Sequence, residues 1–167
     1  MARSIDRVYL RLHRLFMRPG RRQTALDRWA VRWWTRMDAA FFRRFGVSAA
    51  ARMMHVDVVL LRTRGRRTGT TREALVACLD DGDGLIVGGG NWGWDRDPGW
   101  VHNLSAQPEV EVLRGRRAQP LRMRATLLEG LDAERAHAAL TNAYPHSQQY
   151  VQRRTRPVPV VRLDPLA

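Results

Sequence analysis

The segment 56-VDVVLLRTRGRRTGTTREALVACLDDGDGLIVG-88 decides the fold. It contains three apolar runs, over residues 56–63, 71–79 and 85–88, which we predict to be β-strands. Residues 65–69 and 80–84, between these runs, are rich in glycine together with polar residues, as is typical of turns. Turns this short join neighbouring antiparallel strands, so the segment predicts an antiparallel meander.

The rest of the chain adds short strands and short helices. Strands are predicted at residues 110–113, 118–127 and 158–163, and helices at 97–107, 131–143 and 147–154. Asp97 is expected to cap the first of these helices. Because strands and helices do not alternate regularly, we favour an α+β fold with a closed or partly closed antiparallel barrel over a doubly wound parallel sheet.

The composition restricts the class of protein and its chemistry. The chain has 167 residues, 44% apolar and 27% charged, which fits one globular domain or one domain with an appendage. The single cysteine, Cys78, excludes an internal disulfide framework, and the five histidines lack zinc-ligand spacing, so no metal is expected. The chain contains 29 arginines and no lysine. This excludes enzymes that need a lysine in a phosphate-binding loop or a lysine that forms a Schiff base.

Residues 1–54 are the most basic part of the chain, and we predict that they form a helical extension to a barrel domain at 55–167. They contain 13 arginines and three aspartates, which give +10 of the total charge of +13. Amphipathic helices are predicted at residues 3–18 and after a Thr24 cap. The apolar stripe of the second helix consists of Leu26, Trp29, Ala30, Trp33, Met37, Ala40 and Phe41. Opposite it stand Arg28, Arg32, Arg36 and Arg43.

Two roles are open for these basic helices. Their apolar sides either cover the barrel core, as in most amphipathic helices, or lie at the surface of an anionic membrane. A nucleic-acid partner is not expected, because no recognition helix or aromatic sheet motif accompanies the charge. No run approaches the roughly 18 apolar residues of a membrane span, so we expect a cytoplasmic protein with at most peripheral attachment to the plasma membrane.

Two segments have the composition of a binding site. In 63-TRGRRTGTTR-72, four arginines surround two glycines. This composition suits a site that binds phosphate or carboxylate groups, but it also suits a hairpin turn exposed to solvent. The segment 88-GGGNWG-93 has the spacing of a dinucleotide fingerprint but does not lead directly into a long helix. One interpretation is a ligand site, in which a flat ligand contacts the glycine backbone and Trp92, Trp94 and Trp100 line the site. The other is a structural loop whose glycines are packed by tryptophans at the surface. No acid–base motif accompanies these segments, so we expect a cofactor to carry the chemistry.

Three stretches resemble, in the same order, motifs of the deazaflavin-dependent nitroreductases of actinobacteria. They are 63-TRGRRTGTTREAL-75, 86-IVGGGNWGWDRDPGWVHNLSAQPEVEV-112 and 143-AYPHSQQYVQRRTRPVPVVRL-163. The resemblance spans about residues 56–164 and implies a split antiparallel β-barrel of the FMN-binding type. It implies reduced coenzyme F-420, a deazaflavin with a phosphate and an acidic oligoglutamate tail, as the cofactor in preference to FMN. The implied reaction is hydride transfer to a quinone or nitroaromatic; the alternative is a carrier or sensor without turnover.

The resemblance also assigns roles to individual residues. It implies that phosphate and tail are bound by Gly65, Arg66, Arg67, Thr68 and Arg72. The backbone in contact with the deazaflavin would be Gly89, Gly90, Asn91, Trp92 and Gly93. Pro98, Trp100 and Asn103 match a short helix beside the cofactor, and Tyr144 and Tyr150 match tyrosines near the substrate pocket. We expect one of these tyrosines, or solvent, or Ser147 in place of a further family tyrosine, to donate the proton that completes reduction.

Overall fold

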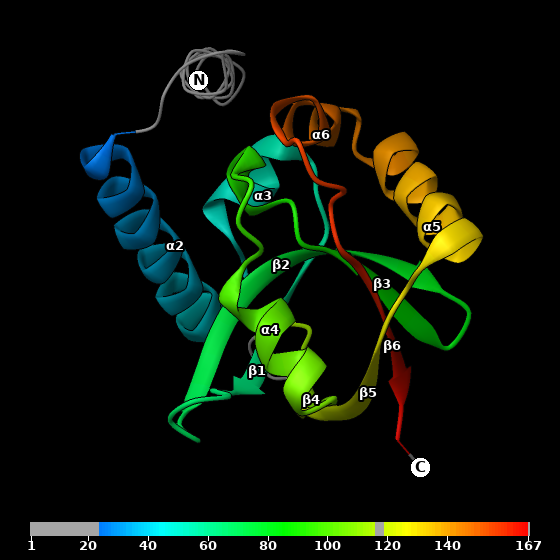
Figure 1. Cartoon of the computed structure of the whole chain (residues 1–167). Helices are drawn as coiled ribbons and strands as arrows, with labels where there is room; N and C mark the ends of the chain where they lie inside the picture. Colours follow the sequence, from blue (N-terminus) through cyan, green and yellow to red (C-terminus); the bar gives the residue numbers. More distant parts are fainter. Residues whose placement is uncertain (1–23, 116–118, 167) are drawn as a thin grey trace.

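The computed structural model describes residues 24–115 and 119–166, and an antiparallel barrel lies at its centre (Figure 1). The strands are β1 (Val58–Arg64), β2 (Thr71–Asp81), β3 (Gly84–Gly88), β4 (Glu109–Leu113), β5 (Leu121–Leu127) and β6 (Val160–Pro165). Their order is β1-β2-β3-β6-β5-β4, and the barrel closes because β1 also pairs with β4. Every pairing is antiparallel, which confirms the predicted barrel.

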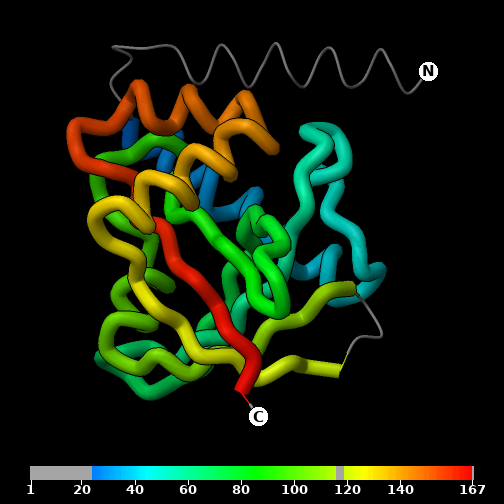
Figure 2. Tube along the Cα trace, turned by 90° about the vertical axis from the view of Figure 1, so that its right-hand side faces the viewer, coloured from blue at the N-terminus to red at the C-terminus, as the bar shows by residue number. Residues whose placement is uncertain are grey.

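The strand boundaries differ slightly from the predicted ones. Asp81 pairs with Gly84, so the turn predicted at 80–84 shrinks to two residues, Gly82 and Asp83. Gly82 has a φ of +64°, a left-handed conformation that glycine adopts without steric penalty. β5 begins at Leu121 instead of 118, and residues 116–118 lie outside the described part. The last strand, β6, begins at Val160 instead of 158 and runs to the C-terminal end (red in Figure 2).

Both faces of β1 are buried, which explains its continuous apolar sequence. Val59 and Leu61 belong to the cluster that fills the barrel, and both side chains are fully buried. Leu60, between them, points to the other face of the sheet, as alternate strand residues do. There it packs against Ala39 and Phe42 of the helix α2 (Ala25–Phe45). The barrel wall is therefore covered from outside by the C-terminal half of α2.

Short helices complete the fold. They are α3 (Ala49–Met54), α4 (Gly99–Ala106), α5 (Gly130–Ala143) and α6 (Gln148–Arg153), with the 3-10 turns η1 (Asn91–Gly93) and η2 (Pro145–Ser147). In Figure 1, α4 lies in front of the barrel, and α2 and α5 lie on opposite sides of it. The predicted counterparts of α4, α5 and α6 are confirmed, with ends that differ by one or two residues. The sequence pattern did not predict α3, which is held to α2 because Ser48 Oγ donates a hydrogen bond to Asp38 (2.6 Å).

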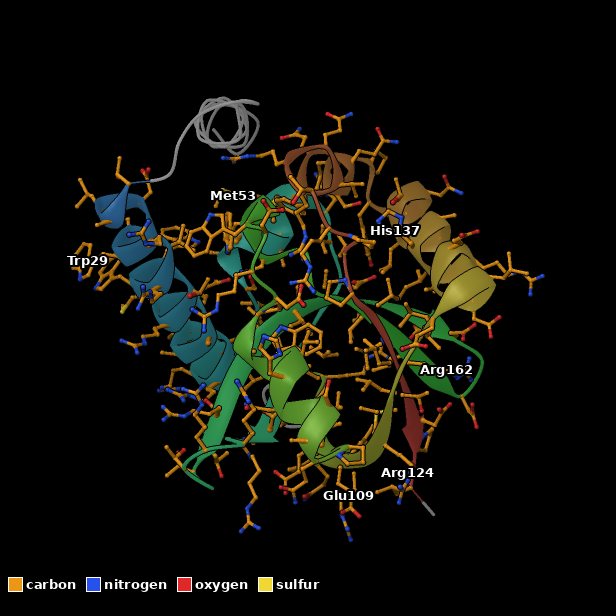
Figure 3. All side chains as sticks on the ribbon, in the orientation of Figure 1. Trp29, Met53, Glu109, Arg124, His137 and Arg162 are labelled. Carbon is orange, nitrogen blue, oxygen red and sulfur yellow. The ribbon has the colours of Figure 1, made fainter. Side chains whose placement is uncertain are left out.

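Helix α2 starts as predicted, but its apolar stripe does not cover the barrel core. Thr24 and Asp27 form a capping box at its start. Trp29 and Trp33 are 63% and 52% exposed, and Trp29 points away from the barrel in Figure 3. The residues that are buried instead, Ala39 and Phe42, lie outside the predicted stripe. For the described helix, the interpretation that the stripe covers the core is therefore wrong.

The N-terminal extension is described only in part. The helix predicted at 3–18 lies outside the described residues, and the division of the chain at residue 54 stays a prediction. Among the helices that the structure describes, none is long and apolar enough to cross a membrane.

The barrel core contains a thiol whose ionisation opposes folding. Burial is the main cause that raises the pKa of Cys78 to about 11, whereas an exposed thiol ionises near pH 8.5. The folded protein keeps this proton while the unfolded chain loses it, so we expect stability to fall as the pH rises from about 9 to 11. Urea unfolding at pH 8, 9.5 and 10.5 would measure the fall. A Cys78→Ala variant should lose less stability over this range; an equally steep decline in the variant would contradict the assignment.

Candidate functional site

A pocket of about 480 Å³ lies between the β1–β2 turn and α4, and we call it the arginine pocket. It is lined by Thr63, Gly65, Arg66, Arg67, Thr68, Arg72, Glu73, Ala74, Arg96, Gly99, Trp100, His102 and Asn103. The pocket therefore brings together every residue that the sequence assigned to phosphate and tail binding. Trp100 and Asn103 of the predicted short helix join them, and Pro98 stands immediately before the pocket-lining Gly99.

Two glycines give the β1–β2 turn its shape. A Cβ on Gly65 would stand 2.8 Å from Thr68 Oγ1 and 3.1 Å from the Thr70 carbonyl oxygen, so no side chain fits there. Gly69 has a φ of +65°, and its N–H donates to the Gly65 carbonyl at 2.7 Å. The turn folds back on itself through these contacts, and the arginines that it carries are exposed.

Asn103 joins this turn to α4. Its side-chain Nδ2 donates to Thr63 Oγ1 (3.0 Å), and its Oδ1 accepts a hydrogen bond from the Arg66 backbone N–H (3.2 Å). The side chain is buried, so these bonds are shielded from water. The predicted cofactor-binding residue Asn103 thus fixes the distance between the two walls of the pocket. The Arg66 backbone N–H is already engaged, which leaves the guanidinium group of Arg66 for a ligand.

The pocket carries uncompensated positive charge. Arg66, Arg67, Arg72 and Arg96 line it, and within residues 24–115 and 119–166 no carboxylate forms an ion pair with any of them. Glu73 also faces the pocket, but its carboxylate is held by Arg62 (3.0 Å) and by Arg43 of α2. The arginine pocket is therefore suited to an anion with several negative charges.

Sequence reasoning missed two basic residues of this pocket. Arg96 precedes α4, and His102 lies on α4 between the predicted residues Trp100 and Asn103. Their position beside motif residues was the only available signal, because a single arginine or histidine in a loop or short helix has no distinctive pattern.

The glycine segment 88–93 lies against its own chain and does not line the arginine pocket. A Cβ on Gly89 would stand 2.8 Å from Pro159 Cγ, and one on Gly90 would stand 3.1 Å from the ring of Tyr150. A Cβ on Gly93 would stand 3.0 Å from Arg153 Cβ. These glycines therefore allow α6 and the segment after it to approach the backbone closely. The predicted contact between this segment and a deazaflavin stays a prediction.

Asn91 and Trp92, between these glycines, have unusual backbone angles. Their φ values are +43° and +58°, in the left-handed region that side chains seldom adopt. The Asn91 side chain donates to the Arg96 carbonyl oxygen (2.5 Å), which helps to hold this conformation.

The three predicted proton donors have different surroundings. The Tyr144 hydroxyl donates to the Cys78 carbonyl oxygen (2.7 Å) and accepts from the Asp57 N–H (3.3 Å), and burial is the main cause that raises its pKa. Tyr150 packs on Gly90 from α6. Ser147 Oγ is buried and has no hydrogen-bond partner in the described part of the chain. The catalytic role of each stays a prediction.

A buried arginine that the sequence did not single out ties the glycine segment to the C-terminal region. Arg154 donates to the Trp94 carbonyl oxygen (2.7 Å) and to Asp97 Oδ1 (2.5 Å). The prediction that Asp97 caps α4 is therefore wrong: the N-cap residue is Pro98, and the Asp97 carboxylate binds Arg154 instead.

In the described residues, no three histidine, cysteine, aspartate or glutamate side chains gather to hold a metal ion.

Comparison with known proteins identifies the family. The model of the family described as F420H(2)-dependent quinone reductase matches residues 34–165. F420H(2)-dependent quinone reductases from two strains of Mycobacterium tuberculosis are each 33% identical over 111 residues, covering 63% of this chain and 71% of the relative. A solved F420-H2 dependent reductase is 26% identical, with a TM-score of 0.58, and the match covers 65% of this chain and 94% of that one.

A second solved structure, described as a domain-swapped dimer, shares the fold. It is 23% identical, with a TM-score of 0.58, over 81% of this chain and 99% of that one. The fold and the sequence match thus agree with the motifs of the arginine turn, the glycine segment and the C-terminal stretch. This chain belongs to the F420H(2)-dependent quinone reductases, oxidoreductases whose cofactor is the reduced coenzyme F-420.

Proposed function

We propose that the arginine pocket binds the phosphate and acidic tail of reduced coenzyme F-420, and that a quinone accepts the hydride. The observation that carries this proposal is the set of four arginines around one cavity, none of them paired with a carboxylate in the described chain. Because the Glu73 carboxylate is held by Arg62 and Arg43, it does not neutralise the four pocket arginines. A polyanionic ligand would supply the missing partners through charge-assisted hydrogen bonds.

The apolar wall of the pocket suits the rest of the cofactor. Trp100 is only 8% exposed and lies on α4, where it excludes water from one side of the cavity. The neighbouring Val101 would be 3.2 Å from a Cβ on Gly89, so the glycine segment adjoins the same helix. When bound, the reduced deazaflavin supplies a hydride and needs no metal. The residues of this chain bind its anionic groups, orient the acceptor and exclude water.

Tyr150 is the residue that we assign to the acceptor side. It lies on α6 over Gly90, at the segment that the family resemblance links to the deazaflavin. Tyr144 is less suited to proton donation, because its O–H already points to the Cys78 carbonyl oxygen. Ser147, with a buried and unpartnered hydroxyl in the described chain, is the second candidate. Nitroaromatics, which are electron-poor like quinones, would be adventitious acceptors.

Substitution of the pocket arginines tests the binding site. Each charge-assisted contact contributes about 1.5 to 3 kcal/mol, so Arg66→Ala and Arg72→Ala should each weaken coenzyme binding by about 10- to 100-fold. The matched control is Arg64→Ala, because Arg64 is exposed on the same hairpin but does not line the pocket. Fluorescence titration with reduced coenzyme F-420, and with FMN in parallel, measures both affinities. Equal affinity in all three variants and the wild type would move the anion site elsewhere.

Substitution of the hydroxyl groups tests the proton donor. Tyr150→Phe should lower kcat with a water-soluble quinone by about 100-fold or more, with little change in coenzyme affinity, because only the proton donor is removed. Tyr144→Phe should mainly lower the melting temperature, since its hydroxyl binds two backbone groups. Unchanged turnover in both Tyr150→Phe and Ser147→Ala would leave solvent as the donor. Binding of the coenzyme without oxidation by any quinone or nitroaromatic would instead indicate a carrier or sensor.

We further propose that α2 lies on the surface of an anionic membrane. Leu26, Trp29 and Trp33 are 71%, 63% and 52% exposed on one side of the helix, while Phe42 holds another side to the barrel. At 3.6 residues per turn, the buried Ala39 and Phe42 lie roughly half a turn from the centre of the stripe. The stripe is therefore free of the barrel, and exposed arginines flank it, as in helices that bind anionic lipid. A quinone dissolved in the lipid would then be accessible.

Co-sedimentation with vesicles tests this orientation. The double substitution of Trp29 and Trp33 to Ser should weaken binding to anionic phospholipid vesicles by about tenfold or more, because both side chains would leave the lipid interface. Leu131→Ser is the matched control, since Leu131 is 68% exposed on α5, across the barrel from α2. Vesicle binding that survives the double substitution unchanged would disprove the proposal. DNA binding over a salt series measures the rival partner.

A further inference from the structure

We propose that Arg154 is a positioning residue for the arginine pocket, and that it acts through Asp97 and α4. Its side chain is fully buried, with 0% exposure, although it is charged. Buried charges are stable only when they are paired and hydrogen-bonded. Arg154 does not line the pocket. Of the two tests below, only the kinetic one rests on the proposed function.

The contacts of Arg154 join two stretches far apart in the sequence. Toward the glycine segment it donates to the Trp94 carbonyl oxygen (2.7 Å) and to Asp97 (2.5 Å). Toward the C-terminal stretch it donates, with longer bonds, to the carbonyl oxygens of Arg156 (3.3 Å) and Pro157 (3.4 Å). All of these acceptors lie in non-repetitive segments that no strand pairing holds in place. Arg154 therefore links these segments through one buried side chain.

Neighbouring contacts reinforce the same junction. The Thr155 N–H donates to Asp95 Oδ1 at 2.6 Å, and this bond is the main cause that lowers the pKa of Asp95. Arg156 lies 3.9 Å from the other oxygen of Asp97. Asp95 and Asp97 are thus both held by the residues that follow α6, and the segment between η1 and α4 is fixed at two points.

This fixed segment leads directly into the wall of the pocket. Asp97 is followed by Pro98, the N-cap residue of α4, and no side chain caps that helix end. A helix of only eight residues has little internal stability, so its position depends on what holds its ends. Asn103, on the same helix, accepts the hydrogen bond from the Arg66 N–H. A shift at Asp97 is therefore transmitted through α4 to the arginine turn.

The geometry requires arginine rather than another cation. The planar guanidinium group donates in several directions at once, to a carbonyl, to a carboxylate and to the C-terminal backbone. A lysine ammonium group keeps the charge for Asp97 but cannot reach all of these acceptors together. Arg154→Lys is thus the informative variant, because it preserves the buried ion pair while it removes the link.

The test compares Arg154→Lys and Asp97→Asn with the control Arg162→Lys in the full chain. Arg162 also contacts carboxylates of two strands, Asp81 and Asp164, but in Figure 3 it lies at the right-hand side of the barrel, well below the helix that Figure 1 labels α6. Amide hydrogen exchange of Arg66, measured by NMR without ligand, is the first readout. The second is steady-state kinetics with reduced coenzyme F-420 and a water-soluble quinone, which separates KM from kcat.

We expect Arg154→Lys and Asp97→Asn to speed the exchange of the Arg66 amide and to raise the coenzyme KM by about tenfold, with a smaller change in kcat. Arg162→Lys should change neither quantity. Unchanged Arg66 exchange in Arg154→Lys, or an equal change in Arg162→Lys, would overturn the positioning role. If exchange responds but the wild type neither binds nor oxidises the coenzyme, the proposed function fails while the positioning role stands. If Asp97→Asn does not fold, Arg154→Lys alone decides.

Discussion

The pairing of β1 with both β2 and β4 is the constraint on which the rest of the structure depends. It closes the barrel, and it makes β1 a strand with neighbours on both edges and apolar contacts on both faces. The hairpin that follows β1 therefore leaves the barrel at a fixed place and angle. The site can hold exposed, charged side chains at its entrance because the backbone beneath them is fixed by a strand that has no free edge.

Neutral contacts build the pocket, and charge is left for the ligand. Asn103 and Thr63 join the two walls through uncharged hydrogen bonds, and Gly65 lets the turn fold tightly. Among the described residues that line the pocket, Glu73 carries the one carboxylate, and arginines outside the pocket hold it. Because of this separation, the pocket arginines form no ion pair with a carboxylate of the described chain. It resembles the preorganisation by which binding sites avoid reorganisation when a charged ligand arrives.

The sequence predicted those features that depend on local chemistry. Glycines and aspartates marked the turns on either side of β2, and Thr24 marked the start of α2. The arginine turn could be predicted as an anion site because its residues are contiguous. By contrast, α3 is only six residues long, too short to show a helical period, and it is held by a bond from Ser48 to Asp38 that only the fold creates.

Long-range contacts explain the remaining errors. Asp97 has the sequence context of a helix cap, but a buried arginine 57 residues later provides a stronger partner. The stripe of α2 has the pattern of a core-facing helix, and only the structure shows that the buried positions Ala39 and Phe42 lie on another side. Amphipathic patterns show that a helix has an apolar side, but they do not show what lies against it.

The crowded glycine segment also limits how this enzyme can diversify. Loops usually accept substitutions more readily than strands do, but here the space for a side chain at Gly89, Gly90 and Gly93 is already filled by α6 and the residues after it. Substitutions are therefore easier to accommodate at residues that surround the glycines than at the glycines themselves. In a library of random variants, this loop should tolerate as few substitutions as a strand of the core.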